Sequence, residues 1–188
     1  EHYSDEYRCF QGFAYDYSGH KIKKIACGPN SADYNWMETC LKKIPAKMLW
    51  GISLHYYTVA TGNWSKKGAA TQFDEKEYFD GVKNALFMDE LLTKHSAIMD
   101  MYDPKKKIAL VVDEWGIWTD LEPDTNPRFL YQQNSMRDAL IAASTLNIFN
   151  NHSDRVRMAN LAQTVNVLQS LILTDKEKML LTPTYHIF

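Results

Sequence analysis

The segment Leu110–Trp118, which reads LVVDEWGIW, constrains the fold of this chain more than any other stretch. Its aliphatic, β-branched start is typical of a strand buried on both faces of a parallel sheet. Two carboxylates follow directly, Asp113 and Glu114, with Trp115 and Trp118 beside them. Because α/β proteins place their chemistry at the carboxyl ends of parallel strands, a carboxylate beside aromatic surface suits a nucleophile that cleaves sugars. The same residues also fit an ordinary strand end whose acids cap the next loop.

Helix-like and strand-like segments alternate along the rest of the chain. Apolar spacing predicts helices over 2–15, 30–44, 74–102 and 129–150, and strands over 22–27, 49–57, 108–113 and 156–163. The apolar stretch 165–173 fits either type. The crossovers are long enough for parallel pairing, and no glycine-rich phosphate turn follows any strand. We therefore predict an α/β fold that forms the C-terminal half of a (β/α)8 barrel, with edge strands that lack their partners.

Capping residues support these helix bounds. Asn30 or Ser31 can cap the second helix, and Asp74 with Glu77 three residues later has the pattern of a capping box at the start of the third. Asp103 and the proline after it end that helix.

Composition excludes several classes of partner. With 21 Lys and Arg against 23 Asp and Glu, the net charge of −2 gives no basic footprint for nucleic acid or an anionic membrane. No apolar run approaches the roughly 20 residues of a membrane span. Cys9, Cys27 and Cys40 lack paired spacing, and the histidines lack metal-binding spacing, so we expect no metal or cofactor. Buried free thiols fit a reducing compartment, and we expect a cytoplasmic protein.

Strand geometry separates the two carboxylates. Side chains alternate between faces, so Leu110, Val112 and Glu114 share one side while Asp113 takes the other. If the first set faces the barrel interior, Glu114 is the reactive group and Asp113 is a buried orienting acid. The opposite assignment stays open, because both faces are apolar.

The preceding strand supplies a partner for such a carboxylate. Ser53, His55 and Tyr57 lie on one face, and the Tyr57 hydroxyl at the strand end can donate to a neighbouring carboxylate. That bond favours the ionised form, which a nucleophile requires. A core aromatic residue and a core histidine are the alternative interpretations of Tyr57 and His55.

Loop residues after the strands complete the candidates. Gln163 closes the fourth strand and can hold a sugar hydroxyl, while Trp64 and Trp118 lie in loops where large rings suggest a binding wall. Packing beneath the loops explains the two rings equally well. The acidic loop 120–124 is expected to be solvated.

Three motifs in order resemble glycoside hydrolase family 51, whose members are mostly α-L-arabinofuranosidases. They are ISLHYY at Ile52–Tyr57, VDEWGIW at Val112–Trp118 and MANLAQTVN at Met158–Asn166, and the similarity runs over 21–186. The resemblance implies a retaining enzyme with a (β/α)8 barrel and an attached β-sandwich. Residues 1–188 then form a partial catalytic barrel domain without the first half-barrel and the sandwich, cut from a longer protein that we expect to be a homo-oligomer.

The resemblance also assigns roles. Glu114 matches the family's nucleophile at the end of the seventh barrel strand, and Tyr57 and Gln163 match residues that bind arabinose. Trp118 matches a ring beside the leaving-group sugar. The expected partner is an arabinose-containing oligosaccharide or polysaccharide, from which the parent protein cleaves terminal α-L-arabinofuranosyl residues of arabinan or arabinoxylan.

One family motif is missing. The general acid/base of the family is a glutamate in a Gly-Asn-Glu motif, whereas Gly62-Asn63 is followed here by Trp64. Retention requires two carboxyl groups about 5–5.5 Å apart, so we expect the isolated chain to be inactive. Two alternatives stay open, a non-catalytic sugar-binding fragment and another retaining glycosidase of the same barrel clan, such as a xylanase or endoglucanase.

Overall fold

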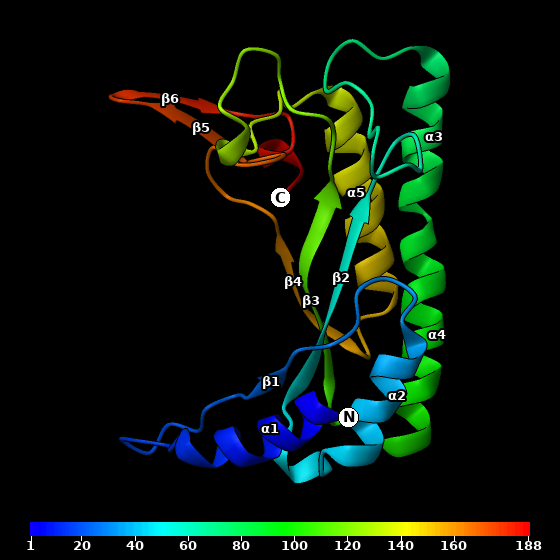
Figure 1. The fold of residues 1–188 in the computed structure, drawn as a ribbon, viewed down its shortest axis with the longest axis vertical. Coiled ribbons are helices and arrows are strands. Elements are labelled where there is room, and N and C mark those ends of the chain that lie inside the picture. The colour runs from blue at the N-terminus through cyan, green and yellow to red at the C-terminus, as the bar shows by residue number, and fades with distance from the viewer. The chain divides into compact units, whose positions relative to one another are not determined.

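A computed structural model describes all residues from 1 to 188. In chain order the elements are α1 (His2–Phe10), β1 (Ile25–Ala26), α2 (Tyr34–Lys43), β2 (Gly51–Thr58), α3 (Glu75–Ala85), α4 (Phe87–Tyr102), β3 (Ala109–Ile117), α5 (Met136–Asn151), β4 (Val156–Leu161), β5 (Ile172–Asp175) and β6 (Lys178–Leu181). Strands β1 to β4 form one sheet in that order, and β5 and β6 form a separate antiparallel pair (Figure 1).

The four-stranded sheet is parallel. β1 and β2 pair in parallel, with Ile25 opposite Gly51. The Ala109 amide donates to the Trp50 carbonyl at 2.8 Å where β3 and β2 begin, and the Trp118 amide donates to the Thr58 carbonyl at 2.9 Å just past their ends. The first residues of β2 and β3 are therefore neighbours, and so are their last residues, as in a parallel pair. The predicted α/β fold with a parallel sheet is confirmed.

The chain divides into two compact units, and β2, β3 and β4 each run through both. The first unit comprises Glu1–His55, Glu90–Asp113 and His152–Ala159; the second comprises Tyr56–Asp89, Glu114–Asn151 and Asn160–Phe188.

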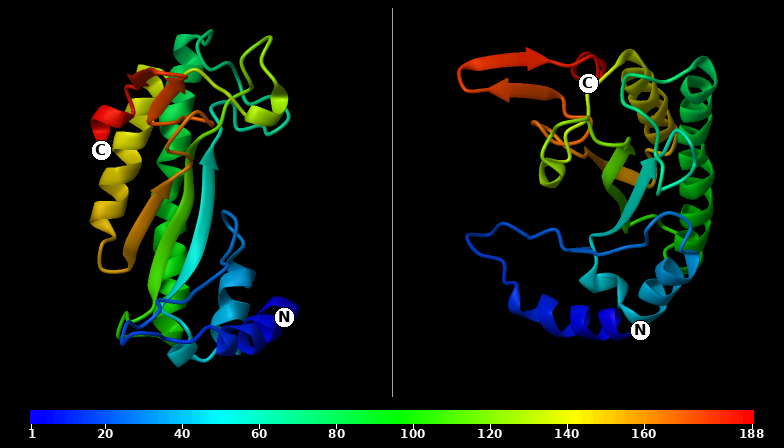
Figure 2. Two further views of the ribbon diagram at one scale, coloured as in Figure 1. Left: turned by 90° about the vertical axis from the view of Figure 1, so that its left-hand side faces the viewer. Right: turned by 45° about the horizontal axis from the view of Figure 1, so that its top comes forward.

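The first unit packs α2 and most of α4 side by side along the beginnings of the strands (Figures 1 and 2). The two helices are joined where the Tyr102 hydroxyl donates to Glu38 at 3.0 Å. Apolar strand residues such as Ile52, Leu110 and Val112 are fully buried there. Strands that are apolar without interruption are buried on both faces, which is why the sequence predicted a sheet covered by helices.

In the second unit, α3 packs against α5 (Figure 2). Ala85, Ile117 and Ile141 form a buried cluster that joins both helices to the end of β3. The buried Trp115 ring packs edge-on against Phe149, with ring centroids 5.0 Å apart. The end of β3, where the predicted nucleophile lies, is therefore held in place by the buried side chains of Trp115 and Ile117.

Helix bounds differ from the prediction in four places. The first predicted helix, 2–15, ends at Phe10, and a short 3-10 turn, Gln11–Phe13, follows it. Asp33 rather than Asn30 or Ser31 caps α2, because its carboxylate accepts from the Trp36 amide at 3.0 Å. The predicted helix 74–102 is two helices that break at Leu86, although Asp74 does cap the first by accepting from the Glu77 amide. α5 begins at Met136, since Leu130 takes a left-handed conformation that no helix accepts. No helix is long and apolar enough to cross a membrane.

The strands differ as well. β3 continues to Ile117, beyond the predicted end at Asp113, because its backbone still has a neighbour to pair with. β1 is only Ile25–Ala26, and the ambiguous segment 165–173 ends in the β5–β6 hairpin. The prediction that all three thiols are buried is wrong, because Cys9 and Cys27 are exposed and only Cys40 is buried; all three are free.

Candidate functional site

Tyr57 and Glu114 form the central contact of the second unit. They lie on the neighbouring strands β2 and β3, and the Tyr57 hydroxyl donates to Glu114 Oε1 at 2.7 Å. Burial, reinforced by the Glu114 carboxylate, raises the pKa of Tyr57 well above its ordinary value. The hydroxyl therefore stays protonated and remains a donor, as the strand geometry predicted.

Asp113 has a different environment, in the first unit. Its Oδ1 lies 3.1 Å from His55 Nε2, and both side chains are about one-third exposed, 38% for the aspartate and 35% for the histidine. The expectation that Asp113 is a buried orienting acid is therefore wrong. The imidazole of the neighbouring strand gives this carboxylate a polar partner at the surface, so it does not need burial to be satisfied.

Trp64 and Trp118 gather around Tyr57. Trp118 packs edge-on against Tyr57 with ring centroids 4.8 Å apart, and Trp64 packs edge-on against Trp118 at 5.5 Å. Trp64 is 53% exposed, which is uncommon for so large an apolar ring. Three residues predicted separately from two loops and a strand thus form one aromatic wall, which we define as Tyr57, Trp64 and Trp118.

Asp120 ties the two loops of this aromatic wall together. Its carboxylate accepts from the backbone amides of Lys67 at 3.2 Å and Gly68 at 3.1 Å, and its own amide donates to the Gly68 carbonyl at 2.9 Å. The bonds place the Lys67 ammonium over the Trp64 and Trp118 rings, 5.5 and 5.7 Å from their centroids. The expectation of a merely solvated acidic loop was therefore wrong for Asp120.

Gln132 holds the backbone on both sides of Trp118. Its Oε1 accepts from the Thr119 amide at 2.9 Å, and its Nε2 donates to the Ile117 carbonyl at 3.2 Å. The side chain is 1% exposed, so these bonds form out of water. Gln132 was not predicted as a site residue, because it lies in a segment predicted to be helical and has no motif around it.

Arg137 anchors the loop that carries Trp64. This fully buried guanidinium donates to the carbonyls of Ala69 at 3.1 Å and Ala70 at 3.3 Å, and it lies 3.9 Å from the centre of the Phe73 ring. The loop that carries Trp64 is therefore fixed at its end by a buried cation as well as by Asp120.

Gln163 lies just after β4 and lines a separate hollow of about 690 Å³ in the second unit. Arg128, Phe129 and Tyr131 share the lining. The predicted residues of the second unit thus fall into two groups, with Tyr57, Trp64, Glu114 and Trp118 joined by direct contacts and Gln163 in the hollow.

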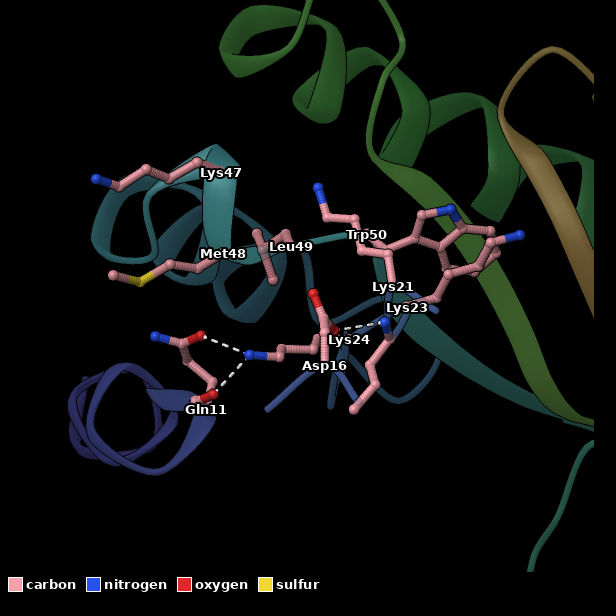
Figure 3. A pocket seen from close by; sticks show the side chains of 10 residues that line it. Gln11, Asp16, Lys21, Lys23, Lys24, Lys47, Met48, Leu49 and Trp50 are labelled. Atoms are coloured by element: carbon pink, nitrogen blue, oxygen red, sulfur yellow. Dashed lines mark hydrogen bonds between the residues drawn. The ribbon is translucent and has the colours of Figure 1, made fainter. Parts of the chain in front are cut away.

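A different hollow, of about 280 Å³, lies in the first unit and includes none of the predicted residues. Four lysines line it, but Lys23 lies along the Trp50 ring and Lys24 donates to Gln11 (Figure 3). These engaged side chains do not converge on a common point, so this hollow is no candidate site. No group of three or more His, Cys, Asp or Glu residues is placed to hold a metal ion.

Fold and site together define a class of protein. A carboxylate at the end of a parallel strand, hydrogen-bonded by a tyrosine and bordered by indole rings, is an arrangement typical of proteins that cleave glycosidic bonds.

Comparison with known proteins agrees with that class. Residues 113–188 match a family described as the alpha-L-arabinofuranosidase C-terminal domain. An intracellular exo-α-L-arabinofuranosidase of Bacteroides ovatus is 47% identical over 188 residues, which are 100% of this chain and 36% of that protein. An intracellular exo-α-(1→5)-L-arabinofuranosidase 1 of Bacillus subtilis is 38% identical over 167 residues, covering 82% of this chain and 31% of the relative.

Solved structures give the same result. The family 51 arabinofuranosidase of Xanthomonas axonopodis superposes with a TM-score of 0.95 at 53% identity, over 99% of this chain and 37% of that one. The α-L-arabinofuranosidase of Thermotoga maritima, solved with arabinose, gives a TM-score of 0.76 at 25% identity, over 99% of this chain and 34% of that one. The chain is therefore similar to glycoside hydrolase family 51 arabinofuranosidases along its whole length, and the resemblance seen in its motifs is confirmed. The chain spans a little over a third of the length of the Bacteroides and Xanthomonas relatives.

Proposed function

We propose that this chain is the part of a retaining exo-α-L-arabinofuranosidase that carries the catalytic nucleophile, Glu114. The observation that carries the proposal is the 2.7 Å hydrogen bond from Tyr57 to the Glu114 carboxylate, beside the rings of Trp64 and Trp118. Residues 1–188 then belong to one catalytic domain, as the C-terminal half of a (β/α)8 barrel whose remaining strands lie elsewhere in the full-length protein.

The proposed reaction has two steps. A Glu114 oxygen attacks the anomeric carbon as the glycosidic bond breaks, and an acid outside this chain protonates the departing oxygen. Water, deprotonated by the same external group, then attacks the anomeric carbon of the glycosyl ester and releases arabinose with its configuration retained. Tyr57 orients the Glu114 carboxylate through the oxygen that it contacts. Gln163 and the two tryptophans supply the sugar contacts. His55, also predicted to bind the sugar, pairs with Asp113 in the first unit.

The proposed substrates are oligosaccharides with terminal α-L-arabinofuranosyl groups, derived from arabinan or arabinoxylan. The names of the relatives, which include an exo-α-(1→5) specificity and an intracellular location, support this substrate class and a cytoplasmic protein. The net charge of −2 supports a neutral ligand over nucleic acid or a membrane surface. We further propose that the full-length enzyme needs no cofactor and is a homo-oligomer.

The test is hydrolysis of 4-nitrophenyl α-L-arabinofuranoside by the full-length protein, with the first product observed by proton NMR. Release of α-L-arabinofuranose before mutarotation is the expected result. An inverted first product contradicts the mechanism. No hydrolysis, together with measurable arabinose binding, favours a sugar-binding protein instead, and preference for aryl xylosides or glucosides favours another glycosidase.

Tyr57→Phe is expected to lower turnover by about 10- to 100-fold while leaving the thermal midpoint nearly unchanged. A hydrogen bond to a charged partner contributes about 1.5–3 kcal/mol, and here the partner is the reacting group. Steady-state kinetics and thermal unfolding of the full-length protein measure the two effects. The matched control is Tyr56→Phe, whose hydroxyl donates to the Asn84 carbonyl at 2.8 Å. That variant is expected to lose stability rather than turnover, and the reverse pattern would make Tyr57 a core residue.

The 188-residue chain expressed by itself is expected to show at most trace arabinofuranosidase activity. General-acid help contributes about 10²–10⁴-fold, and the chain has no Gly-Asn-Glu motif to provide it. Small misplacement of Glu114 in the absence of neighbouring strands lowers the rate further. The assay compares this chain with the full-length protein on an aryl arabinofuranoside. Equal activity would show that a carboxylate within residues 1–188 is the acid.

A further inference from the structure

The backbone around Trp118 is held from more than one side. Its own amide donates to the carbonyl of Thr58, the last residue of β2, at 2.9 Å. The carbonyl before it, of Ile117, accepts from the Gln132 side chain at 3.2 Å, and the amide after it, of Thr119, donates to the same side chain at 2.9 Å. Because the peptide groups on both sides of Trp118 are fixed, the place from which its indole ring projects is fixed as well.

Only one orientation of the Gln132 amide satisfies both of its bonds. The amide oxygen faces an N–H donor and the amide nitrogen faces a carbonyl acceptor, so exchanging the two would leave both backbone groups without a partner. Gln132 and Thr119 are each 1% exposed, so water does not replace either bond when it is lost. The Gln132 side chain is therefore a rigid link between the two backbone groups that flank Trp118.

The segment that carries Gln132 is itself fixed on both sides. Before Gln132, the Leu130 carbonyl accepts from the Leu168 amide at 2.9 Å. After it, the Asn134 amide donates to the Thr184 hydroxyl at 2.7 Å. Both bonds reach the part of the chain that follows β4, so the support for the aromatic wall comes from outside the loop that carries Trp118.

Trp118 in turn limits the position of the Tyr57 ring. The two rings pack edge-on, with centroids 4.8 Å apart and planes inclined by 69°. The Tyr57 hydroxyl donates to Glu114 Oε1 at 2.7 Å. A hydrogen bond weakens steeply as its angle departs from linear, so a tyrosine ring that is free to tilt makes a weaker bond to the carboxylate. The indole restricts that tilt on the side that it occupies.

We propose that Gln132 is a positioning residue for the proposed reaction, because by fixing Trp118 it keeps the Tyr57 hydroxyl on the Glu114 carboxylate. Both side-chain bonds of Gln132 are made with backbone groups, so it acts through Trp118 and Tyr57 and not by bonding the carboxylate itself. The proposal rests on the proposed function in one respect, since it takes Glu114 as the nucleophile.

The experiment is a double-mutant cycle in the full-length protein, with Gln132→Met and Tyr57→Phe made separately and together. Methionine is close to glutamine in length, so Gln132→Met removes both hydrogen bonds without opening a large cavity. With 4-nitrophenyl α-L-arabinofuranoside, Gln132→Met is expected to lower kcat by about 10-fold and to change KM by less than about 2-fold, because misplacing a reacting group slows the chemical step. In the Tyr57→Phe background, which lacks the hydroxyl, the same substitution is expected to lower kcat by less than about 2-fold.

The matched control is Thr182→Val. Thr182 is also 1% exposed, and its hydroxyl also joins two backbone groups of the second unit, donating to the Ser170 carbonyl at 2.9 Å and accepting from the Tyr185 amide at 3.4 Å. We expect Thr182→Val to lower the thermal midpoint about as much as Gln132→Met does, while kcat stays within about 2-fold of the wild-type value. A general loosening of the second unit would instead lower kcat in both variants.

Three results overturn the proposal: a wild-type kcat in Gln132→Met, an equal fold-loss of kcat with and without the Tyr57 hydroxyl, or a loss in Thr182→Val as large as in Gln132→Met. The free energies of unfolding of the same variants separate this proposal from the proposed function. An inert wild-type protein would refute the enzyme. Non-additive unfolding free energies would then still show that Gln132 and Tyr57 are coupled, and additive ones would refute the coupling as well.

Discussion

Replacing Glu114 with alanine in the full-length protein is expected to lower hydrolysis of an aryl α-L-arabinofuranoside by at least about 10³-fold, with sodium azide restoring part of the rate. The carboxylate accepts the Tyr57 hydroxyl at 2.7 Å at the end of β3, which fits a held nucleophile. Alanine leaves space in which a small anion can attack the anomeric carbon, provided that the acid/base is intact. The glycosyl azide product is identified by mass spectrometry and NMR.

The neighbouring carboxylate is the control for this prediction. Asp113→Ala removes an exposed carboxylate paired with His55, and we expect it to keep far more activity than Glu114→Ala and to gain nothing from azide. An inactive Asp113→Ala beside a Glu114→Ala variant with wild-type rates would show that the reactive carboxylate is Asp113.

Gly116→Ala is expected to destabilise the second unit by about 3 kcal/mol or more, the combined cost of backbone strain and overpacking. Gly116 has a φ of 136°, which side-chain-bearing residues rarely adopt, and an added Cβ lies 1.2 Å from Gln169 Nε2. Gln169 is fully buried and donates to the Trp115 carbonyl at 3.5 Å, so it has no free space into which to move. Chemical denaturation and thermal unfolding of the full-length protein measure the loss.

Two further variants identify the cause. Gly12→Ala is the matched control, because an added Cβ there meets nothing within 4 Å, and we expect little change in stability. Adding Gln169→Ala to Gly116→Ala relieves the clash but not the strain, so partial recovery is expected. Wild-type stability of Gly116→Ala alone would contradict the described path of the chain after Glu114.

Local pattern was sufficient to predict the main elements of the fold. The apolar run before Asp113 predicted a strand of a parallel sheet, because a strand buried on both faces is apolar along its whole length. The apolar spacing of the segments between strands predicted the helices that cover the sheet. Element ends were predicted less well. The break at Leu86 and the left-handed Leu130 depend on tertiary packing that periodicity does not record.

The candidate site was predicted where a strand end and a motif coincided. Tyr57 and Glu114 were predicted from their places at strand ends and Trp118 from its loop and motif, and the structure brings them together. Alternation did not separate the two carboxylates as predicted, because Asp113 and Glu114 contact His55 and Tyr57, two alternate residues of β2. Gln132 and Asp120 were not predicted as contributors, since their roles come from the paths of loops that meet only in the folded chain. Nothing in a lone glutamine indicates that its amide holds the backbone on both sides of a tryptophan.

The bonds of Asp120 to the Lys67–Gly68 backbone have a consequence for redesign and for divergence of the protein. The segment that displays Trp64 is not a modular insert, because its C-terminal end is fastened twice, by Asp120 at Lys67–Gly68 and by Arg137 at Ala69–Ala70. A grafted segment must present two backbone amides as donors to the Asp120 carboxylate, and it must keep a glycine at position 68, where a Cβ would meet Glu77. Changes of length in the two loops are therefore expected to occur in pairs, so specificity is altered by exchanging both loops as one unit.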